Sequence, residues 1–466
     1  MAIGTTEHPL RVAIVGSGPA GFYAAGHLLR CKTHPDLCVQ VDMFDRLPTP
    51  WGLVRAGVAP DHPNIKAVSR VYEKTAEHPE FRFFGNVELG RDISHDDLTS
   101  RYHAVIYAVG AQTDRRMGIP GEDLPGSWAA TEFVAWYNGH PDYKDLVFDL
   151  SAERAIVVGN GNVATDVARM LALTRDELAA TDVADHSLEV LAESGVKEIV
   201  VLGRRGPAQA AFTNPELLEL GDMTDADVFV DPGDVELDPL SKAFIESEAA
   251  HNTQKKNVQI LSEYSTREPA GKRRRIVLRF LVSPVAILGS ERVEGIRFVH
   301  NELVESDNGS LRPRPTDVTE ELDCGLVFRS IGYRGTRIPG VPFDEDTCTI
   351  PNEHGRITGR TGEYTVGWIK RGPTGIIGTN KRDAQETVDS VLADLDAGRL
   401  PAPADPDRDS LEALIAERQP DAVSYAGWQA VDRVEREAGE PQGRPRVKLC
   451  SFEELLEAAK DATPAP

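Results

Sequence analysis

The sequence predicts an α/β protein with two Rossmann-like domains, and three observations support this. Two glycine-rich turns, at 16–21 and 159–164, each lie between a short apolar run and an apolar helical pattern. A buried strand, a tight turn and a helix in this order are typical of a parallel α/β sheet. The length of 466 residues accommodates two or three domains, and 41% hydrophobic residues are ordinary for a globular chain.

The first turn, Gly-Ser-Gly-Pro-Ala-Gly at 16–21, has the spacing of a dinucleotide-binding fingerprint. Gly16 permits the bend from strand to helix, Gly18 lets the backbone approach a pyrophosphate, and Gly21 allows the helix to pack closely. The next apolar run ends in Asp45, 24 positions after Gly21, where a carboxylate can bind ribose hydroxyls. An ordinary tight turn is the alternative for the glycines alone, and this context favours a dinucleotide site.

The second turn, 159–164, reads Gly-Asn-Gly-Asn-Val-Ala and also follows an apolar run. The next predicted strand, 197–202, is followed by Arg204 and Arg205. An NAD site favours an acid at such a strand end, whereas paired arginines suit the 2′-phosphate of NADP. A solvated strand end is the alternative for the arginines. The polar stretch 173–195 is expected to be an inserted helical excursion.

Two turns with different strand-end residues favour two cofactors, FAD at the first and NADPH at the second. NADPH gives up its electrons as a hydride, whereas a flavin can release them one at a time. The five cysteines, Cys31, Cys38, Cys324, Cys348 and Cys450, form no C-x-x-C pair, which disfavours thiol redox chemistry and iron–sulfur ligation. We therefore expect no metal site, and we expect the electrons to leave toward a separate acceptor.

The net charge of −23, from 51 basic and 74 acidic residues, disfavours nucleic acid and anionic membranes as partners. No apolar run approaches the ~18 residues that cross a bilayer, and residues 1–9 lack the pattern of a secretory signal. Together with the few cysteines, these features predict a cytoplasmic protein.

Other stretches carry structural expectations. Prolines and glycines in 47–63 argue against a helix or a central strand, and we expect this long loop to line a binding site, with Asp61 capping the next helix. Stretches 275–282 and 292–299 are expected to be antiparallel strands. The basic run 272–275 is typical of a solvated hairpin tip, with a docking site as the alternative.

The sequence as a whole resembles the adrenodoxin-reductase-type NADPH–ferredoxin reductases, especially their actinobacterial members. The motifs that carry the resemblance extend over essentially the whole chain. They are the turn 16–21, the loop 47–63, the turn 159–164, the arginine motif 203–207, the segment 366–377 and the basic tail 443–449, which is interpreted as a clamp.

The resemblance implies a glutathione-reductase-like architecture of two three-layer β/β/α domains. Residues 1–112 and 330–466 would form a discontinuous FAD domain with a C-terminal extension at 400–466, and 113–329 an inserted NADP domain. The implied reaction is hydride transfer from NADPH to FAD, followed by single-electron transfer to a ferredoxin that could feed cytochrome P450 or iron–sulfur systems. A monomer or weak dimer is expected.

The family's cofactor contacts transfer to this chain residue by residue. Besides Gly16, Gly18 and Gly21, the FAD contacts would be Ala20, Asp45, Leu53, Val87, Trp368, Gly375, Ile376 and Ile377. The NADP contacts would be Arg115, Asn160, Gly161, Asn162, Val163, Arg204, Arg205, Glu216 and Gly375. Asp45 stands where the family usually has a glutamate, and it can serve the same purpose.

His62 and Glu219 match a histidine and a glutamate that lie near the two redox rings in the family. Hydride transfer needs no acid or base, so positioning, electrostatic and proton-relay roles are expected for these candidate catalytic residues. A loop histidine hydrogen-bonded near a helix start is the alternative for His62. Leu218 replaces the family's usual docking arginine, which leaves the strength and identity of ferredoxin docking open.

Two other functions remain open from the sequence. One is an NADPH-dependent flavin monooxygenase or another FAD oxidoreductase with a small-molecule acceptor, whose NADPH consumption would require an organic substrate. The other is a nucleotide-binding structural subunit without turnover, which a yellow protein bleached by NADPH would exclude.

Overall fold

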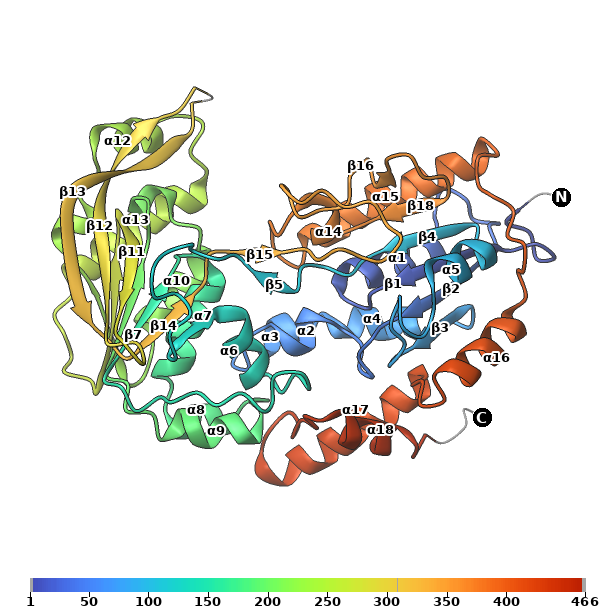
Figure 1. Ribbon diagram of the computed structural model, residues 1–466, viewed down its shortest axis with the longest axis horizontal. Helices are drawn as coiled ribbons and strands as arrows, with labels where there is room; N and C mark the ends of the chain where they lie inside the picture. Colours follow the sequence, from blue (N-terminus) through green and yellow to red (C-terminus); the bar gives the residue numbers. More distant parts are fainter. Residues whose placement is uncertain (1–2, 308, 463–466) are drawn as a thin grey trace.

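The computed structural model describes residues 3–307 and 309–462, which form two lobes side by side (Figure 1). The first lobe contains a seven-stranded sheet and the second a six-stranded sheet. All strands of the second sheet lie between β4 and β16 in the sequence. Within the described ranges, none of the helices combines the length and the apolar character needed to cross a lipid bilayer.

The sheet of the first lobe has the order β16-β17-β18-β4-β1-β2-β3. Strands β18, β4, β1, β2 and β3 pair in parallel, and β16 and β17 extend the sheet as antiparallel strands. The bounds are β1 (Leu10–Val15), β2 (Val39–Phe44), β3 (Phe81–Phe84), β4 (Ala104–Tyr107), β16 (Asn352–Glu353), β17 (Arg356–Ile357) and β18 (Glu363–Thr365). Every residue of β1 is buried, as expected for a central parallel strand.

Helices cover the first sheet and form its main core. Side chains of α1, α4 and α15 pack with those of β1, β2 and β18 in one apolar cluster. The helices of this lobe are α1 (Pro19–Leu29), α2 (Leu53–Ala56), α3 (Pro63–Lys66), α4 (Ser69–Ala76), α5 (His95–Arg101), α14 (Trp368–Arg371) and α15 (Thr379–Asp396).

The sheet of the second lobe, β6-β14-β7-β8-β10-β9, is parallel throughout. Its strands are β6 (Ser127–Ala129), β7 (Arg154–Val158), β8 (Glu198–Leu202), β9 (Ala226–Val230), β10 (Arg274–Arg279) and β14 (Leu326–Arg329). An antiparallel sheet of β11 (Val282–Leu288), β12 (Gly295–Glu305) and β13 (Leu311–Asp323) packs on one face through a cluster that includes Val200, Ile296 and Phe298.

Helices cover the other face, so the predicted β/β/α layering is confirmed in this lobe. The helices of this lobe are α6 (Ala130–Tyr137), α7 (Asn162–Ala172), α8 (Arg175–Ala179), α9 (Asp185–Ala192), α10 (Asn214–Gly221), α11 (Pro232–Val235), α12 (Pro239–Glu246) and α13 (Asn252–Ser265), with the 3₁₀ turn η1 (Pro207–Gln209); α12 lies beside β12 rather than on this face. Helices α8 and α9 form the expected excursion at 173–195. Two short antiparallel strands, β5 (Thr113–Asp114) and β15 (Tyr333–Arg334), run between the lobes.

Three local expectations are wrong. The stretch 275–282 does not form an antiparallel strand, because β10 lies in parallel between β8 and β9, and the chain reverses at Leu281, whose φ is 55°. The loop 47–63 contains the one-turn helix α2, which fits between its prolines. Asp61 does not cap the next helix, because the N-cap residue of α3 is His62. The carboxylate of Asp61 binds Arg169 instead.

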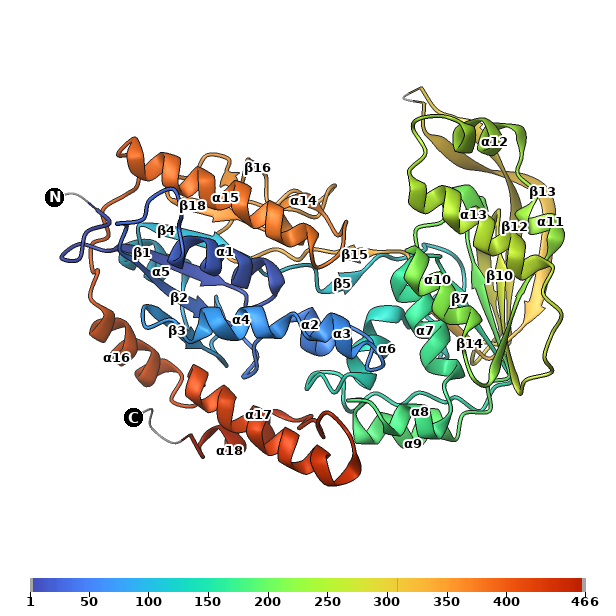
Figure 2. The same ribbon diagram turned by 180° about the vertical axis from the view of Figure 1, so that it is seen from behind.

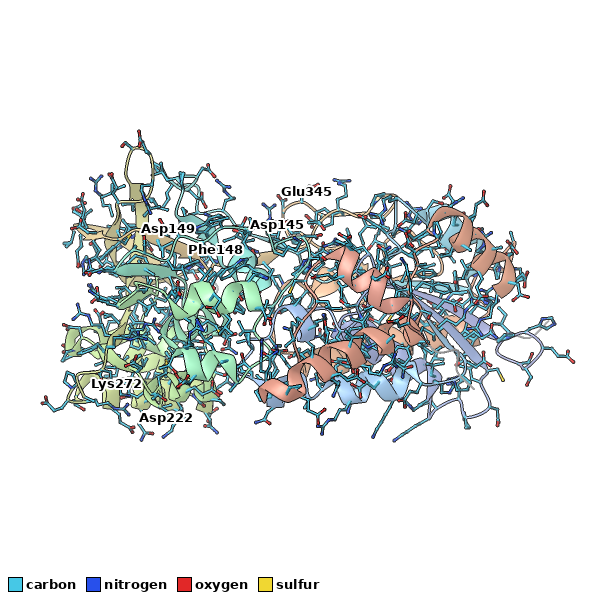
Figure 3. The ribbon with its side chains drawn as sticks, turned by 90° about the horizontal axis from the view of Figure 1, so that it is seen from below. Asp145, Phe148, Asp149, Asp222, Lys272 and Glu345 are labelled. Atoms are coloured by element: carbon cyan, nitrogen blue, oxygen red, sulfur yellow. The ribbon has the colours of Figure 1, made fainter. Side chains whose placement is uncertain are left out.

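The basic run 272–275 leads into the parallel strand β10 and is therefore not a hairpin tip, although Arg273 and Arg275 are about half exposed. Arg274 is 2% exposed and donates to the carbonyl oxygens of Leu173 at 2.7 Å and Val196 at 3.1 Å. Arg273 pairs with Asp225 at 2.8 Å. Lys272 lies at the outer end of the lobe, on the same side as Asp222 (Figure 3). The docking interpretation of the run stays a prediction.

The C-terminal segment runs from the first lobe to the second. Helices α16 (Arg408–Arg418) and α17 (Tyr425–Gly439) follow the edge of the first lobe, and α17 ends next to α9 (Figures 1 and 2). After η2 (Glu440–Gln442), Arg444 donates to the carbonyl oxygen of Thr181 at 3.1 Å and pairs with Asp185 at 2.5 Å. The chain then returns to α18 (Phe452–Ala459). The basic tail therefore joins the two lobes.

Glu435 on α17 holds this tail in place from a fully buried position. Its carboxylate pairs with Arg55 at 2.5 Å and with Arg446 at 2.8 Å, and it accepts the amide of Leu449 at 2.9 Å. Burial opposes ionisation, but the two guanidinium groups outweigh it and lower the pKa of Glu435. The carboxylate is therefore ionised when the protein is folded.

We expect Glu435→Gln to lower the free energy of unfolding by about 3 kcal/mol, because the change leaves two buried guanidinium groups without their shared countercharge. Urea unfolding followed by tryptophan fluorescence measures the loss. Because the pKa of Glu435 is lowered by folding, its stabilisation is complete above the ordinary glutamate pKa of 4.5 and is lost as the pH falls below it. The difference between variant and wild type should therefore shrink in acid.

Glu437→Gln, at an exposed position on the same helix, is the matched control and should change the stability by less than about 0.5 kcal/mol. Equal losses in the two variants would contradict the role assigned to Glu435.

Candidate functional site

The first glycine turn leaves an open space in front of α1. Gly16 has a φ of 106°, and a Cβ there would lie 2.5 Å from the carbonyl oxygen of Ala108. A Cβ on Gly21 would lie 2.2 Å from the carbonyl oxygen of Gly16, whereas a Cβ on Gly18 would meet nothing within 4 Å. Helix α1 has no side-chain cap at its start, so its first amides are available to an anionic group such as a pyrophosphate.

Asp45 lies beside this turn, as predicted. Its Oδ2 accepts the amide of Ser17 at 2.8 Å and the hydroxyl of Ser17 at 2.6 Å, and its Oδ1 accepts the amide of Leu47 at 2.9 Å. These bonds fix the carboxylate at the carboxyl end of β2. The amide of Val87 donates to the carbonyl oxygen of Asp45 at 2.9 Å, so Val87 contributes backbone here while its side chain packs in the core.

Segments far apart in the sequence converge on the first turn. A Cβ on Gly52 would lie 2.8 Å from the Cα of Gly18, and a Cβ on Gly367 would lie 2.7 Å from the Cβ of Ala20. The loop 47–63 and the start of α14 therefore adjoin the turn. Leu53, half-buried, begins α2 within the same loop.

Two features beside the first turn fit a bound aromatic cofactor. The indole nitrogen of Trp368 is buried and has no hydrogen-bond partner within the described part of the chain. Ile376 is 61% exposed, although it is a large apolar side chain. Gly375, Ile376 and Ile377 lie just before Gly378, the N-cap residue of α15, and Gly375 has a φ of 80°. A ligand lying against these residues would cover the apolar surface and could accept the indole hydrogen bond.

The second glycine turn repeats this arrangement. A Cβ on Gly159 would lie 2.1 Å from the carbonyl oxygen of Ser330, and a Cβ on Gly161 would meet nothing within 4 Å. Helix α7 begins at Asn162 without a side-chain cap. The Oδ1 of Asn162 accepts the amide of Thr213 at 2.8 Å, and the buried Nδ2 of Asn160 has no partner within the described residues. Val163 is half-buried next to Asn162 in α7.

Arg204 and Arg205 follow the carboxyl end of β8. Neither guanidinium forms an ion pair with a carboxylate in the part of the chain that the structure describes. Burial and the neighbouring Arg204 lower the pKa of Arg205. Two adjacent cations without a countercharge suit an additional phosphate. Arg115 is exposed just after β5, at the junction of the lobes, and its amide donates to the carbonyl oxygen of Gly332 at 3.0 Å.

His62 and Glu219 meet across the junction of the two lobes. The Nε2 of His62 lies 2.7 Å from the Oε2 of Glu219, and 3.8 Å from the Oε2 of Glu216. Glu216 and Glu219 are both on α10, as their spacing predicts. His62 is 8% exposed and forms no side-chain cap on α3, so its ring faces the second lobe rather than its own helix start. Leu218, between the two glutamates, is 44% exposed.

Sequence reasoning missed the residue with the most contacts in this cluster, Arg169 on α7. Its guanidinium pairs with Asp61 at 2.5 Å, Asp166 at 2.7 Å, Glu216 at 3.2 Å and Glu219 at 3.5 Å. A charged pair three residues apart, Asp166 and Arg169, in an otherwise mostly apolar helix was the available signal. This spacing could not identify Asp61 as the partner of Arg169, because the two residues are far apart in the sequence.

The cluster is dominated by acids. Burial, and then the charge of Asp166, raise the pKa of Glu216 to about 7. Burial also raises the pKa of Asp166, whereas for Asp61 the bond to Arg169 outweighs burial and lowers the pKa. The ligand atoms of His62, Glu216 and Glu219 lie close enough to hold a cation. The guanidinium of Arg169 already places a positive charge against both glutamates.

Comparison with known proteins finds similar oxidoreductases by sequence family, by sequence identity and by structure. Residues 10–200 match the family model described as pyridine nucleotide-disulphide oxidoreductase. The chain is 54% identical to the NADPH-ferredoxin reductase FprA of Mycobacterium leprae over 452 residues, which cover 97% of this chain and 98% of the relative. It is 40% identical to the mitochondrial NADPH:adrenodoxin oxidoreductase of Salvelinus fontinalis, covering 97% and 91% of the two chains.

A solved structure of Mycobacterium tuberculosis FprA in complex with NADPH superimposes with a TM-score of 0.93. Its sequence identity is 52%, and the match covers 97% of this chain and 100% of the other. The predicted glutathione-reductase-like α/β architecture agrees with the family model and with this structure.

We expect the Glu216→Gln variant to gain melting temperature relative to wild type as the pH rises from about 5 to 7. In the folded protein the pKa of Glu216 is about 7, compared with 4.5 for an ordinary glutamate. The folded state therefore keeps a proton that the unfolded chain releases, and this group contributes less stability as the pH rises through that range. Glutamine cannot ionise and escapes the loss.

Differential scanning fluorimetry of both proteins across this range measures the effect. Glu263→Gln, exposed on α13, is the control and should show a constant difference from wild type. A pH-independent difference for Glu216→Gln would mean that the pKa of Glu216 is not raised.

Proposed function

Because the chain belongs to the NADPH–ferredoxin reductase family, which includes the adrenodoxin reductases, we propose that it transfers a hydride from NADPH to FAD and passes single electrons to a ferredoxin. The observation that carries this proposal is the 2.7 Å contact of His62 with Glu219, which joins the two lobes between their glycine turns. One chain thus holds two dinucleotide sites that face a common junction.

The first lobe supplies the FAD site. Gly18 leaves room for the pyrophosphate at the start of α1, Gly16 and Gly21 permit the close backbone packing of the turn, and Asp45 lies at the strand end where the ribose would bind. Trp368 and the exposed Ile376 offer the apolar surface for the ring. When bound, FAD supplies the conversion of a two-electron donor into single-electron steps.

The second lobe supplies the NADP site. The amides at the start of α7 suit the pyrophosphate, and the unpaired Asn160 amide offers a further donor. Arg204 and Arg205 would hold the 2′-phosphate. Glu216 is at the junction, so we assign it to the nicotinamide end of the site.

His62 and Glu219 position the reacting rings and offer a proton-relay contact at the junction. The Nε2 of His62 lies 2.7 Å from the Oε2 of Glu219, and the His62 ring is buried while the Glu219 side chain is 43% exposed. Both residues act through position and charge, because transfer of a hydride requires no acid or base in the protein.

The same proposal includes the domain boundaries, the cellular location and the ferredoxin contact of this protein. We place the boundaries of the inserted NADP domain near 113 and 329, where the chain passes between the sheets at β5 and after β14. A cytoplasmic location is supported by five free cysteines. An exposed Leu218 at the junction favours a ferredoxin whose docking surface tolerates an apolar contact there.

We expect Arg204→Ala and Arg205→Ala each to lower kcat/KM for NADPH by about 10- to 100-fold, because each removes a charged hydrogen bond to the 2′-phosphate. The kcat/KM for NADH, which lacks that phosphate, should change less than about threefold. Steady-state assays with both coenzymes measure the ratio. Arg273→Ala, whose guanidinium pairs with Asp225, is the control and should leave both values unchanged. An unaltered preference in the Arg204 and Arg205 variants would refute the phosphate assignment.

The purified protein should be yellow and should be bleached anaerobically by NADPH. We expect cytochrome c reduction by NADPH to accelerate severalfold when a ferredoxin from the same organism is added, because the ferredoxin carries single electrons between the two proteins. An NADPH oxidation that ignores ferredoxin and instead requires an organic substrate, with a hydroxylated product, would point to a monooxygenase.

A further inference from the structure

We propose that Arg169 is the positioning residue that sets how closely the nicotinamide of NADPH approaches the flavin. This inference deepens the proposed function and rests on hydride transfer from NADPH to FAD. Arg169 touches neither glycine turn. It acts through the carboxylates that it joins across the junction of the two lobes.

Arg169 is 3% exposed and connects the two lobes directly. Its Nε donates to the Oδ2 of Asp61 at 2.5 Å, and its Nη2 to the Oδ1 of Asp61 at 3.2 Å. Asp61 belongs to the loop 47–63, which adjoins the first glycine turn. Arg169 itself lies on α7, the helix that begins at the second glycine turn. The bidentate pair therefore links the structural supports of both cofactor sites.

The remaining donors of Arg169 orient the residues at the junction. Nη2 donates to Asp166 at 2.7 Å and lies 3.4 Å from the Nδ1 of His62, while Nη1 donates to Glu216 at 3.2 Å. Only a planar guanidinium has donors that can reach these groups at the same time. A lysine is a single point charge on a flexible stem, and it would leave part of the set unbound.

The position of Arg169 in α7 explains why it would affect ring geometry. Arg169 lies seven residues after Asn162, the first residue of α7. At about 1.5 Å per residue, its backbone is about 10 Å along the helix from the amides that suit the pyrophosphate. Asp61 directly precedes His62, whose ring contacts Glu219. A rigid helix on one side and an adjacent residue on the other leave little freedom between the two sites.

Other contacts hold the lobes together without Arg169. Lys66 pairs with Asp182 at 2.6 Å, and Lys448 pairs with the same carboxylate at 3.3 Å. Arg46 forms a further ion pair with Asp142 at the edge of the junction. Loss of Arg169 should therefore alter the approach of the rings while the lobes stay joined.

The test is anaerobic stopped-flow reduction of the FAD-loaded enzyme by NADPH, for wild type, Arg169→Lys, Arg169→Met and Asp61→Asn. We expect the limiting rate constant of flavin reduction to fall about tenfold or more in each variant, since small displacements of reacting atoms cost large factors in rate. The Kd for NADPH should change less than about threefold, because the glycine turn and the paired arginines are intact.

A double variant, Asp61→Asn with Arg169→Met, should be no slower than the slower single variant, because both changes break the same link. Asp142→Asn is the matched control: it removes an ion pair between the lobes away from the cluster and should reduce the flavin at the wild-type rate. If Arg169→Met fails to retain FAD, the limiting rate constants of Asp61→Asn and Arg169→Lys decide whether the inference holds.

Three results would overturn the inference while leaving the proposed function intact. These are wild-type rates in the Arg169 and Asp61 variants, an equal slowing in Asp142→Asn, or a loss confined to the Kd for NADPH. A wild-type flavin that NADPH does not reduce would instead refute the proposed function itself.

Discussion

Buried charge at the junction of the two lobes is the constraint on which the rest of the structure depends. Asp61, Arg169 and Glu216 form one group there, and Lys66, Lys448 and Asp182 form another. Transferring such groups from water is costly unless each finds a partner of opposite charge at hydrogen-bonding distance. Ion pairs of this kind are directional, so the lobes must pack in the one orientation that satisfies them.

The tail of the chain reinforces the same orientation. Glu435 is fully buried and binds Arg55 of the first lobe and Arg446 of the tail, while Arg444 reaches the carbonyl oxygen of Thr181 in the second lobe. These bonds close the junction on the side of α17. For an enzyme that moves a hydride between two bound rings, a fixed orientation matters because the reacting atoms must meet at a short distance.

Much of the fold and part of the candidate site could be predicted from local patterns. The glycine turns, the helical excursion at 173–195 and the two α/β sheets are confirmed, since each depends on residues close together in the sequence. The family, FAD and NADP as cofactors and ferredoxin reduction agree with the relatives of this chain. The individual cofactor contacts and the roles of His62 and Glu219 remain predictions.

What the sequence by itself determined is local: two glycine turns between a strand and a helix, and paired arginines after a strand, from which the phosphate contacts are predicted. Only the tertiary structure decided how these sites face each other. In the folded chain Asp61 binds Arg169 and does not cap a helix as expected, and β10 lies in parallel between β8 and β9. The physical reason is that a glycine turn is specified by neighbouring residues, whereas a buried ion pair needs two partners whose separation in the sequence, from 61 to 169, no local pattern records.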